Sequence, residues 1–162
     1  MHTVLVPTSQ QLQRQWRALR HDIATDRPAE QVLQMVVDWW NQVPIGNASL
    51  NNLDPASWPD PWLLLDCGNM DRNTTALGMC WTLLLSDDAV WTADRLQLLL
   101  LRNRTESWER LVLVVDNQWV LNHDRQGPTH ITDIQDIVCM HSYVYDMHKR
   151  RFLDTSKGLL AV

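Results

Sequence analysis

The sequence is poor in glycine and has none of the motifs that bind nucleotides. It holds five glycines in 162 residues, and neither GxxxxGK[ST] nor GxGxxG occurs in it. Both motifs need closely spaced glycines so that backbone N–H groups can surround a phosphate. The scarcity of glycine therefore argues against a nucleotide cofactor.

Cysteine is also scarce, with three residues and no CxxC pair. An odd number without paired spacing argues against a disulfide framework and against a zinc ribbon. HxxxH and HExxH are absent too, although His141 and His148 lie two helical turns apart with Asp146 between them. We therefore expect no bound metal and no other cofactor.

Long hydrophobic runs and an excess of positive charge are missing as well. No apolar run reaches the roughly 18 residues of a membrane-spanning helix, and the net charge of −5 argues against nucleic-acid binding. The first residues, MHTVLVPTSQQ, do not have the pattern of a signal peptide. We expect no nucleic acid and no membrane as partners, and synthesis in a reducing cytoplasm. The basic cluster Lys149–Arg151 then reads as a solvated or interface-facing tail.

Tryptophan, by contrast, is abundant, with nine residues against one phenylalanine. The chain is 45% hydrophobic and 20% charged, which is typical of one globular domain and predicts a single domain over residues 1–162. Tryptophan offers a large apolar area with one polar group and is enriched at protein interfaces. The aromatic candidates for an interface are Trp58, Trp62, Trp108 and Phe152.

The N-terminal part, residues 1–44, is predicted to be helical. Thr3–Val6 is a short apolar run that could form an edge strand or an extended arm. Thr8 or Ser9 can cap a helix that reaches about Ile23, because apolar residues recur at intervals of four, three and four. A second helix is expected from about residue 29 to Trp40, apolar over more than half of its circumference.

Residues 45–61 are predicted to form a long polar loop, because Pro55, Pro59 and Pro61 forbid regular structure there. A short helix is expected at residues 62–65.

The stretch DCGNMDRNTTALGMCWTLLLS, residues 66–86, is central to the prediction. It joins a polar turn to a helix that begins at Asn73 or Thr74 and is apolar nearly all round, which is typical of a core helix. Gly78 inside this helix predicts close packing against another backbone.

The second half of the chain predicts strands. Residues 95–102 and 111–115 read as buried strands. Asp116-Asn117 is a two-residue turn signal between the second of these and a returning strand. Gly127-Pro128 is expected to interrupt regular structure, and residues 147–162 are expected to form a tail. The expected strands are residues 95–102, 111–115, 119–121 and, as a last edge strand, 142–145. We predict an α+β fold in which the N-terminal helices and the core helix pack on a small antiparallel sheet of three to five strands.

The residues themselves offer one candidate for catalysis, a cysteine nucleophile. Cys67 precedes the core helix, and a helix N-terminus lowers a thiol pKa. His123 is the histidine that would serve as its base. Cys80 and Cys139 lie in apolar runs and are expected to be core residues.

Three segments resemble the bacterial transglutaminase-like cysteine peptidases. WPDPWLLL, residues 58–65, looks like the W-x-x-P-x-E-x-L lead-in of that family, and ALGM, residues 76–79, looks like its core helix. LVLVVDNQWVL, residues 111–121, looks like the hairpin that carries the catalytic His and Asp. The resemblance covers about residues 55–125. It implies a transglutaminase-like, papain-like arrangement of the fold.

The resemblance also implies that the catalytic residues are lost. In this register the family's cysteine falls on about Arg72, its histidine on about Arg110 and its aspartate on about Asn122. The Glu-Asp pair that follows the family's cysteine is replaced by Asn73-Thr74. A triad without nucleophile and base retains no covalent catalysis, so we expect a protein that is not an enzyme.

Segments of the form DWWN-x-x-P-x-x-N, WPDPW and ALGMCWTLLL are also similar to small uncharacterised proteins of tailed bacteriophages. This similarity implies a structural or assembly protein of the virion, in the neck, tail or baseplate, made in the host cytoplasm. Its partners would be other phage protein chains. Two alternatives stay open: an active cysteine hydrolase that uses Cys67 with His123, and a small cytoplasmic regulator that binds a host protein.

Overall fold

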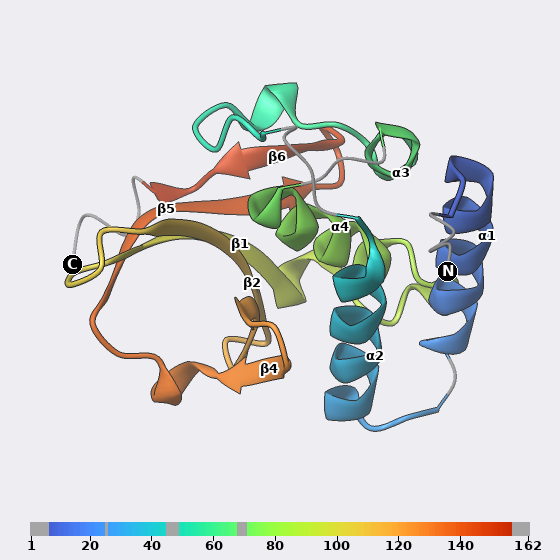
Figure 1. Ribbon diagram of the computed structural model, residues 1–162, viewed down its shortest axis with the longest axis horizontal. Coiled ribbons are helices and arrows are strands. Elements are labelled where there is room, and N and C mark those ends of the chain that lie inside the picture. Colours follow the sequence, from blue (N-terminus) through green and yellow to red (C-terminus); the bar gives the residue numbers. More distant parts are fainter. Residues whose placement is uncertain (1–6, 25, 45–48, 68–70, 157–162) are drawn as a thin grey trace, which may run out of the picture.

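The computed structural model describes residues 7–24, 26–44, 49–67 and 71–156. The short N-terminal run Thr3–Val6 and the end of the tail lie outside these residues, as does part of the predicted loop. The described chain forms helices and one antiparallel sheet (Figure 1), so the predicted α+β class is confirmed.

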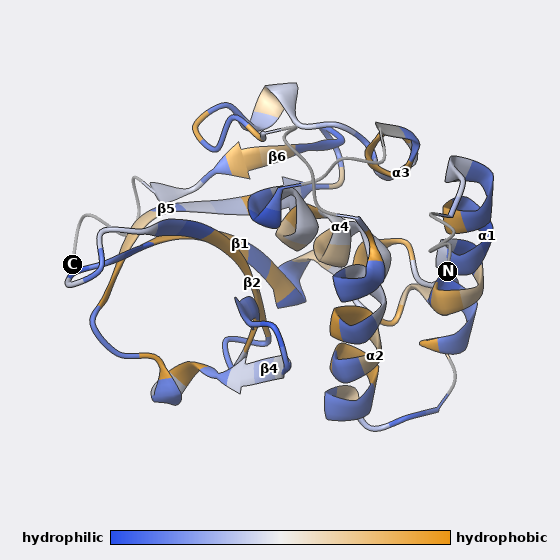
Figure 2. Ribbon diagram, in the orientation of Figure 1, coloured by the Kyte–Doolittle hydropathy of each residue, from blue (hydrophilic) through white to orange (hydrophobic). Residues whose placement is uncertain are grey.

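The two N-terminal helices, α1 (Ser9–Asp22) and α2 (Ala29–Gln42), form where the hydrophobic spacing predicts them. A capping box begins α1: the Thr8 backbone N–H donates to the Gln11 side chain at 2.8 Å, and the Gln11 N–H donates to the Thr8 hydroxyl at 3.2 Å. Figure 2 shows that α1 has a hydrophilic outer surface, whereas orange hydrophobic stretches recur along α2. Five side chains of α2 are buried, as its wide apolar face predicts.

The loop between α2 and the core helix is partly ordered by a 3₁₀ turn, η1 (Pro55–Ser57). A short helix, α3 (Pro61–Cys67), follows it. The core helix, α4 (Arg72–Leu84), begins one or two residues earlier than predicted because Asp71 caps it. Gly78 of α4 faces the indole of Trp40 and not another backbone, since a Cβ added there would lie 2.6 Å from Cζ2 of that ring.

Six strands make up the sheet, in the order β4-β3-β2-β1-β5-β6. This is one strand more than the upper limit of the prediction. The central hairpin is as predicted, and Asp116 and Asn117 at its turn both have positive φ, 55° and 54°. The strands are β1 (Leu96–Asn103), β2 (Glu109–Val115), β3 (Trp119–Asp124), β4 (Gly127–His130), β5 (Ile137–Asp146) and β6 (Arg151–Asp154).

The two outer strands are the ones that the prediction missed. Pro128 does not end regular structure but lies within β4, an edge strand, where a missing N–H costs no ladder bond. The predicted edge strand 142–145 belongs to the longer β5, which lies between β1 and β6. The predicted tail therefore contributes an edge strand of its own, because β6 pairs with β5 from Arg151, opposite Asp146, to Asp154, opposite Tyr143.

The helices cover one face of the sheet, and the other face is concave because β1 and β2 curve strongly (Figure 1). Alternate side chains of β2 divide between the two faces. Leu111, Leu113 and Val115 join the main core beneath the helices. Val112 and Val114 join a smaller cluster with Leu101 and Val120 on the concave face.

Three helices meet at one hydroxyl group in the main core. Thr82 of α4 accepts hydrogen bonds from the indole N–H groups of Trp16 on α1 and Trp40 on α2, both at 2.8 Å. Its own hydroxyl donates to the Gly78 carbonyl at 2.7 Å. All of these groups are buried, so the hydroxyl satisfies two indole donors that would otherwise have no partner.

Candidate functional site

The N-terminus of α4 lies against the ends of β2 and β3. Asp71 caps the helix by accepting from the Thr74 backbone N–H at 2.8 Å. Asn73, in the first turn, accepts from the Leu111 N–H of β2 at 2.9 Å. The helix start is therefore tied to the strand by its second residue, and Arg72, the first residue of α4, is placed beside the sheet.

Asn122 completes this attachment from β3. Its side-chain amide donates to the carbonyl oxygens of Arg72 at 2.7 Å and Leu111 at 2.9 Å. Asn122 is 5% exposed and has a φ of 74°, a left-handed conformation that asparagine tolerates better than most residues. One buried side chain thus joins the start of α4 to β2 and β3.

Arg110 comes from β2 and reaches the same end of β3. Its guanidinium lies over the Trp108 ring, 4.6 Å from the ring centre, and donates to the His123 carbonyl at 2.9 Å. Burial lowers the pKa of Arg110. Burial, and secondly the charge of Arg110, lower the pKa of Arg72. The structure therefore brings together Arg72, Arg110 and Asn122, three residues far apart in the sequence.

His123 is the one predicted base in this region. Burial lowers its pKa, and the charge of Arg110 lowers it further. Its Nδ1 atom is buried and has no hydrogen-bond partner among the described residues. Cys67 is the last residue of α3, and its side chain lies outside what the structure describes.

The other two cysteines do not take part in this site. Cys80 is buried in α4, and burial raises the pKa of its thiol, so the prediction of a core residue is confirmed. Cys139 was expected in the core as well, but this expectation is wrong, because Cys139 is exposed on β5. Its S–H contacts the His141 carbonyl at 3.4 Å.

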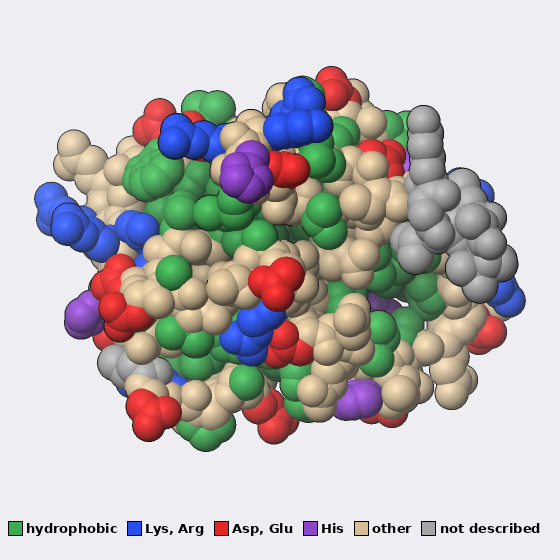
Figure 3. Space-filling view, turned by 180° about the vertical axis from the view of Figure 1, so that it is seen from behind, with side chains coloured by type: hydrophobic (Ala, Val, Ile, Leu, Met, Phe, Trp, Pro, Cys, Tyr) green, Lys and Arg blue, Asp and Glu red, His purple; other side chains and the backbone are tan. Residues whose placement is uncertain are grey.

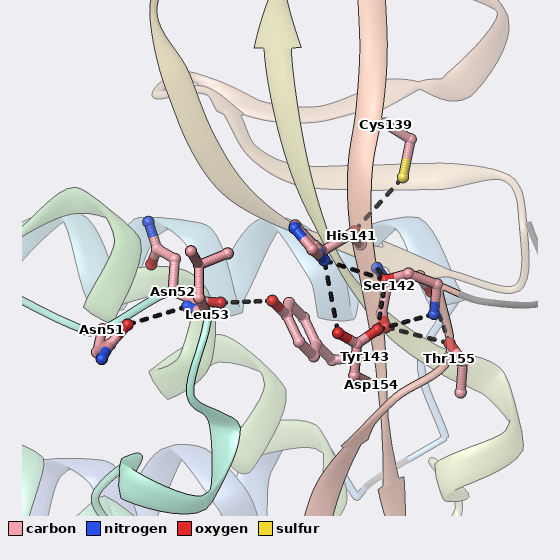
Figure 4. A network of polar contacts seen from close by, with 10 residues as sticks. Asn51, Asn52, Leu53, Cys139, His141, Ser142, Tyr143, Asp154 and Thr155 are labelled. Carbon is pink, nitrogen blue, oxygen red and sulfur yellow. Dashed lines mark hydrogen bonds and ion pairs between the residues drawn. The ribbon is translucent and has the colours of Figure 1, made fainter. Parts of the chain in front are cut away.

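A second polar cluster contains Ser156, His141 and Asp154, of which His141 and Asp154 are labelled in Figure 4. Asp154 Oδ2 and Ser156 Oγ lie 3.5 Å and 3.3 Å from His141, but both approach the same ring nitrogen, Nδ1. A catalytic triad needs its nucleophile and its carboxylate on opposite ring nitrogens. Ser156 also accepts from the Ser142 N–H at 3.0 Å. The arrangement therefore fastens the end of β6 to β5 and does not activate a nucleophile.

Tyr143 extends this cluster toward the loop before η1. Its hydroxyl donates to the Asn52 carbonyl at 2.5 Å, as Figure 4 shows. Burial, together with the negative charge of Asp154, raises the pKa of Tyr143 to about 12. The hydroxyl therefore stays protonated at neutral pH and fixes the loop to the sheet.

The four aromatic interface candidates differ in their surroundings. Trp62 of α3 is 49% exposed and makes an edge contact with Trp16. Trp58 is partly buried and packs on Tyr143. Trp108 is partly buried beneath Arg110. Phe152, however, is 4% exposed and belongs to the main core. The chain itself covers this ring, which therefore cannot offer contact area to a partner.

Within the described ranges, no group of three or more His, Cys, Asp or Glu side chains could hold a metal ion. His141 is engaged with Asp154 and Ser156. His148 follows β5 in an exposed turn, where its backbone N–H donates to Asp146 at 2.9 Å. None of the helices in the described residues is long and apolar enough to cross a membrane.

The antiparallel sheet with a core helix starting against two neighbouring strands defines a transglutaminase-like fold. Solved structures of LapG from Legionella pneumophila, a transglutaminase-like cysteine protease, share it. One has 15% identity and a TM-score of 0.62 over 85% of this chain and 82% of LapG. A calcium-bound form has 15% identity and a TM-score of 0.63, with coverages of 84% and 83%. An EGTA-treated form has 14% identity and a TM-score of 0.63, with coverages of 95% and 94%.

No family model matches the sequence, and no curated protein is detectably similar to it. At 14–15% identity the likeness to LapG concerns the fold alone. The chemistry of this chain therefore depends on its own residues.

Proposed function

We propose that this chain is a non-enzymatic protein on a transglutaminase-like scaffold. In this proposal it serves as a structural or assembly component of a bacteriophage particle, in the neck, tail or baseplate, and acts through protein–protein contacts. The observation that supports it most directly is the identity of the three side chains that converge at the start of α4. They are Arg72, Arg110 and Asn122, the same residues onto which the sequence register maps the family's Cys, His and Asp.

These three side chains are unsuited to covalent catalysis. A guanidinium stays protonated at neutral pH and is neither a nucleophile nor a general base. An asparagine orients the imidazole in Cys-His-Asn proteases, but Asn122 has an arginine and no histidine at position 110 to orient. Its two N–H donors are already used on backbone carbonyls. Asn122 therefore holds the start of α4 to the strands, at the position where the register places the third triad residue of an active protease.

The assembly role draws on the surface and on the similarity to phage proteins. Trp62 and Leu63 of α3 are 49% and 50% exposed, which gives this short helix an apolar outer surface. On the face opposite to that of Figure 1, hydrophobic side chains gather in a patch among charged groups of both signs (Figure 3). Apolar patches bordered by charged groups are a common form of protein interface.

The rate of thiol alkylation as a function of pH tests the absence of catalysis. In the wild-type chain we expect Cys67 to react as an ordinary thiol, with a pKa of about 8.5. The matched variant Cys67→Ser identifies which part of the reaction belongs to this residue. A Cys67 thiolate that persists well below pH 7 would instead support a cysteine hydrolase that uses Cys67 with His123, especially if His123→Ala removed the effect.

A gain-of-function experiment tests the register. The triple variant Arg72→Cys, Arg110→His, Asn122→Asp would place a thiol at the N-terminus of α4 beside an imidazole. We expect this new thiol to have a pKa below that of Cys67, because the helix N-terminus and an imidazolium both stabilise a thiolate. An ordinary pKa in a folded triple variant would show that the three positions are not those of a former triad.

Mass spectrometry of purified particles tests the assembly role. We expect this chain in the virion at a fixed ratio to the other structural proteins. Its absence from particles, together with capture of one host protein from lysate, would favour a cytoplasmic regulator instead.

A further inference from the structure

Two arginines lie near the start of α4, where the Asp71 carboxylate is already used as the helix cap. Arg72 and Arg110 are both partly buried, and neither forms an ion pair with any described residue. Arg125 is close enough to add to the effect on Arg72. The backbone N–H groups at a helix N-terminus carry a partial positive charge of about half a unit, and here the Asp71 carboxylate accepts one of them. The positive charge that no described ion pair neutralises is therefore that of the Arg72 and Arg110 guanidinium groups.

Two like charges held together in a partly buried place repel each other. Burial is the main cause of the lowered pKa of the Arg72 guanidinium, and the positive charges of Arg110 and Arg125 lower it further. Asp124 is the described carboxylate whose charge acts in the opposite direction. It is exposed, and it accepts from the Gln126 N–H at 2.8 Å. The native arrangement thus leaves the repulsion only partly compensated.

The same region contains two buried nitrogen atoms without partners. They are Nε of Arg72 and Nδ1 of His123. In folded proteins the large majority of buried polar atoms have a hydrogen-bond partner, and each exception calls for an explanation such as an ion or a water. A negatively charged oxygen beside Arg72 would satisfy the guanidinium and remove the repulsion between the cations at once.

We propose that Arg72 and Arg110, with His123 beside them, bind a compact oxyanion, either a carboxylate or a phosphate. The planar guanidinium presents paired N–H donors that match two oxygens of such a group. Trp108 orients Arg110 by lying under its guanidinium, and the hydrogen bond to the His123 carbonyl fixes one of its nitrogens. The remaining donors of Arg110 are available to the ligand. This site does not depend on the assembly role, because its chemistry requires only the cations and the helix.

The test is a titration of the ¹⁵N-labelled full chain, followed by NMR. Sodium acetate and inorganic phosphate are added in separate series, and sodium chloride at equal ionic strength serves as the reference. We expect saturable shifts of the amide signals at the start of α4 and of the Arg72 and Arg110 Nε–H signals. Saturation with acetate alone identifies a carboxylate site, and saturation with phosphate alone identifies a phosphate site. Shifts no larger than those in chloride, or shifts that do not saturate, would overturn the proposal.

Variants add a second, independent readout. Arg72→Gln and Arg110→Gln should each weaken binding about ten-fold or more, since each removes charged hydrogen bonds to the ligand. Arg151→Gln, at an exposed position of β6, is the matched control and should leave binding unchanged. Equal affinity in all three folded variants would contradict the site. If one variant fails to fold, the other variant and the wild-type shift map still decide the question.

Discussion

The side-chain amide of Asn122 donates to the backbone carbonyl of Arg72 at 2.7 Å. Fifty residues of sequence separate the two, and the bond fixes the first turn of the core helix to the end of β3. Its second bond, to the Leu111 carbonyl, adds β2 to the same attachment. Asn122 is thus a neutral side chain that donates to the carbonyl groups of two different elements.

Asn122→Asp should therefore destabilise the protein. An ionised aspartate accepts hydrogen bonds but donates none, so it would face two carbonyl oxygens that have lost their donor. We expect the free energy of unfolding at pH 7 to fall by about 2–4 kcal/mol, measured by urea denaturation. Asn117→Asp, at the positive φ of the hairpin turn, is the control, with an expected change within about 0.5 kcal/mol. Equal stability of the two variants would refute the structural role of Asn122.

Thr82→Val should be destabilising although it keeps the shape of the side chain. Valine has no oxygen to accept from the indole groups of Trp16 and Trp40, and both would be left buried without a partner. We expect a loss of about 2–4 kcal/mol in the free energy of unfolding. Thr82→Ser keeps the hydroxyl and loses one methyl group, at a cost of about 1 kcal/mol. The reverse order of the two variants would show that the hydroxyl does not hold the helices together.

The sequence is sufficient to predict features that depend on near neighbours. The spacing of apolar residues predicts α1, α2 and α4, and Asp116-Asn117 predicts the hairpin, because each pattern extends over only a few residues. The shared oxygen of Thr82 could not be predicted, because its donors lie 66 and 42 residues away. The two outer strands escaped prediction because Pro128 in β4 and the basic segment before β6 are both typical of irregular structure.

The candidate site also combines features that the sequence indicates with features that it does not. A family register, and not a local pattern, indicated Arg72, Arg110 and Asn122 as one group. Nothing in the sequence near Trp108 indicates that its ring supports Arg110, since Trp108 lies in a polar loop. Phe152 was predicted at an interface as an aromatic residue, but the pairing of β6 with β5 carries it into the core.

Gly78→Ala should destabilise the core although alanine is the better helix former. Alanine gains about 1 kcal/mol in helix propensity over glycine. Its Cβ, however, would press on the Trp40 ring, which is itself held by its bond to Thr82. We expect a net loss of about 1–3 kcal/mol from overpacking. In a double-mutant cycle with Trp40→Phe, which has a smaller ring, the penalty of the alanine should shrink. A purely additive cycle would argue against this contact.

Asp116 should make the folded state sensitive to acid. Its carboxylate receives two hydrogen bonds from Arg95, both at 2.7 Å, and chiefly these bonds hold its pKa below the ordinary value. A carboxyl group whose pKa is lower in the folded than in the unfolded state stabilises the fold above the unfolded pKa of about 3.9. This contribution is lost as the pH falls through the folded pKa. The side chains of Arg95 and Asp116 are 30% and 34% exposed, so solvent screening limits the effect to about 1 kcal/mol or less.

Urea denaturation at pH 6 and at pH 2.5 measures this contribution. Asp116→Asn keeps a residue that tolerates the positive φ of the turn, but it cannot titrate. The variant should therefore lose less stability than the wild type between the two pH values. Asp133→Asn, at an exposed carboxylate of the 3₁₀ turn Ile131–Asp133, is the control and should follow the wild type. Added sodium chloride should reduce the difference between wild type and Asp116→Asn, because it screens the exposed part of the pair. A difference that is absent at low salt would mean that the Arg95 pair does not contribute to the acid sensitivity of the fold.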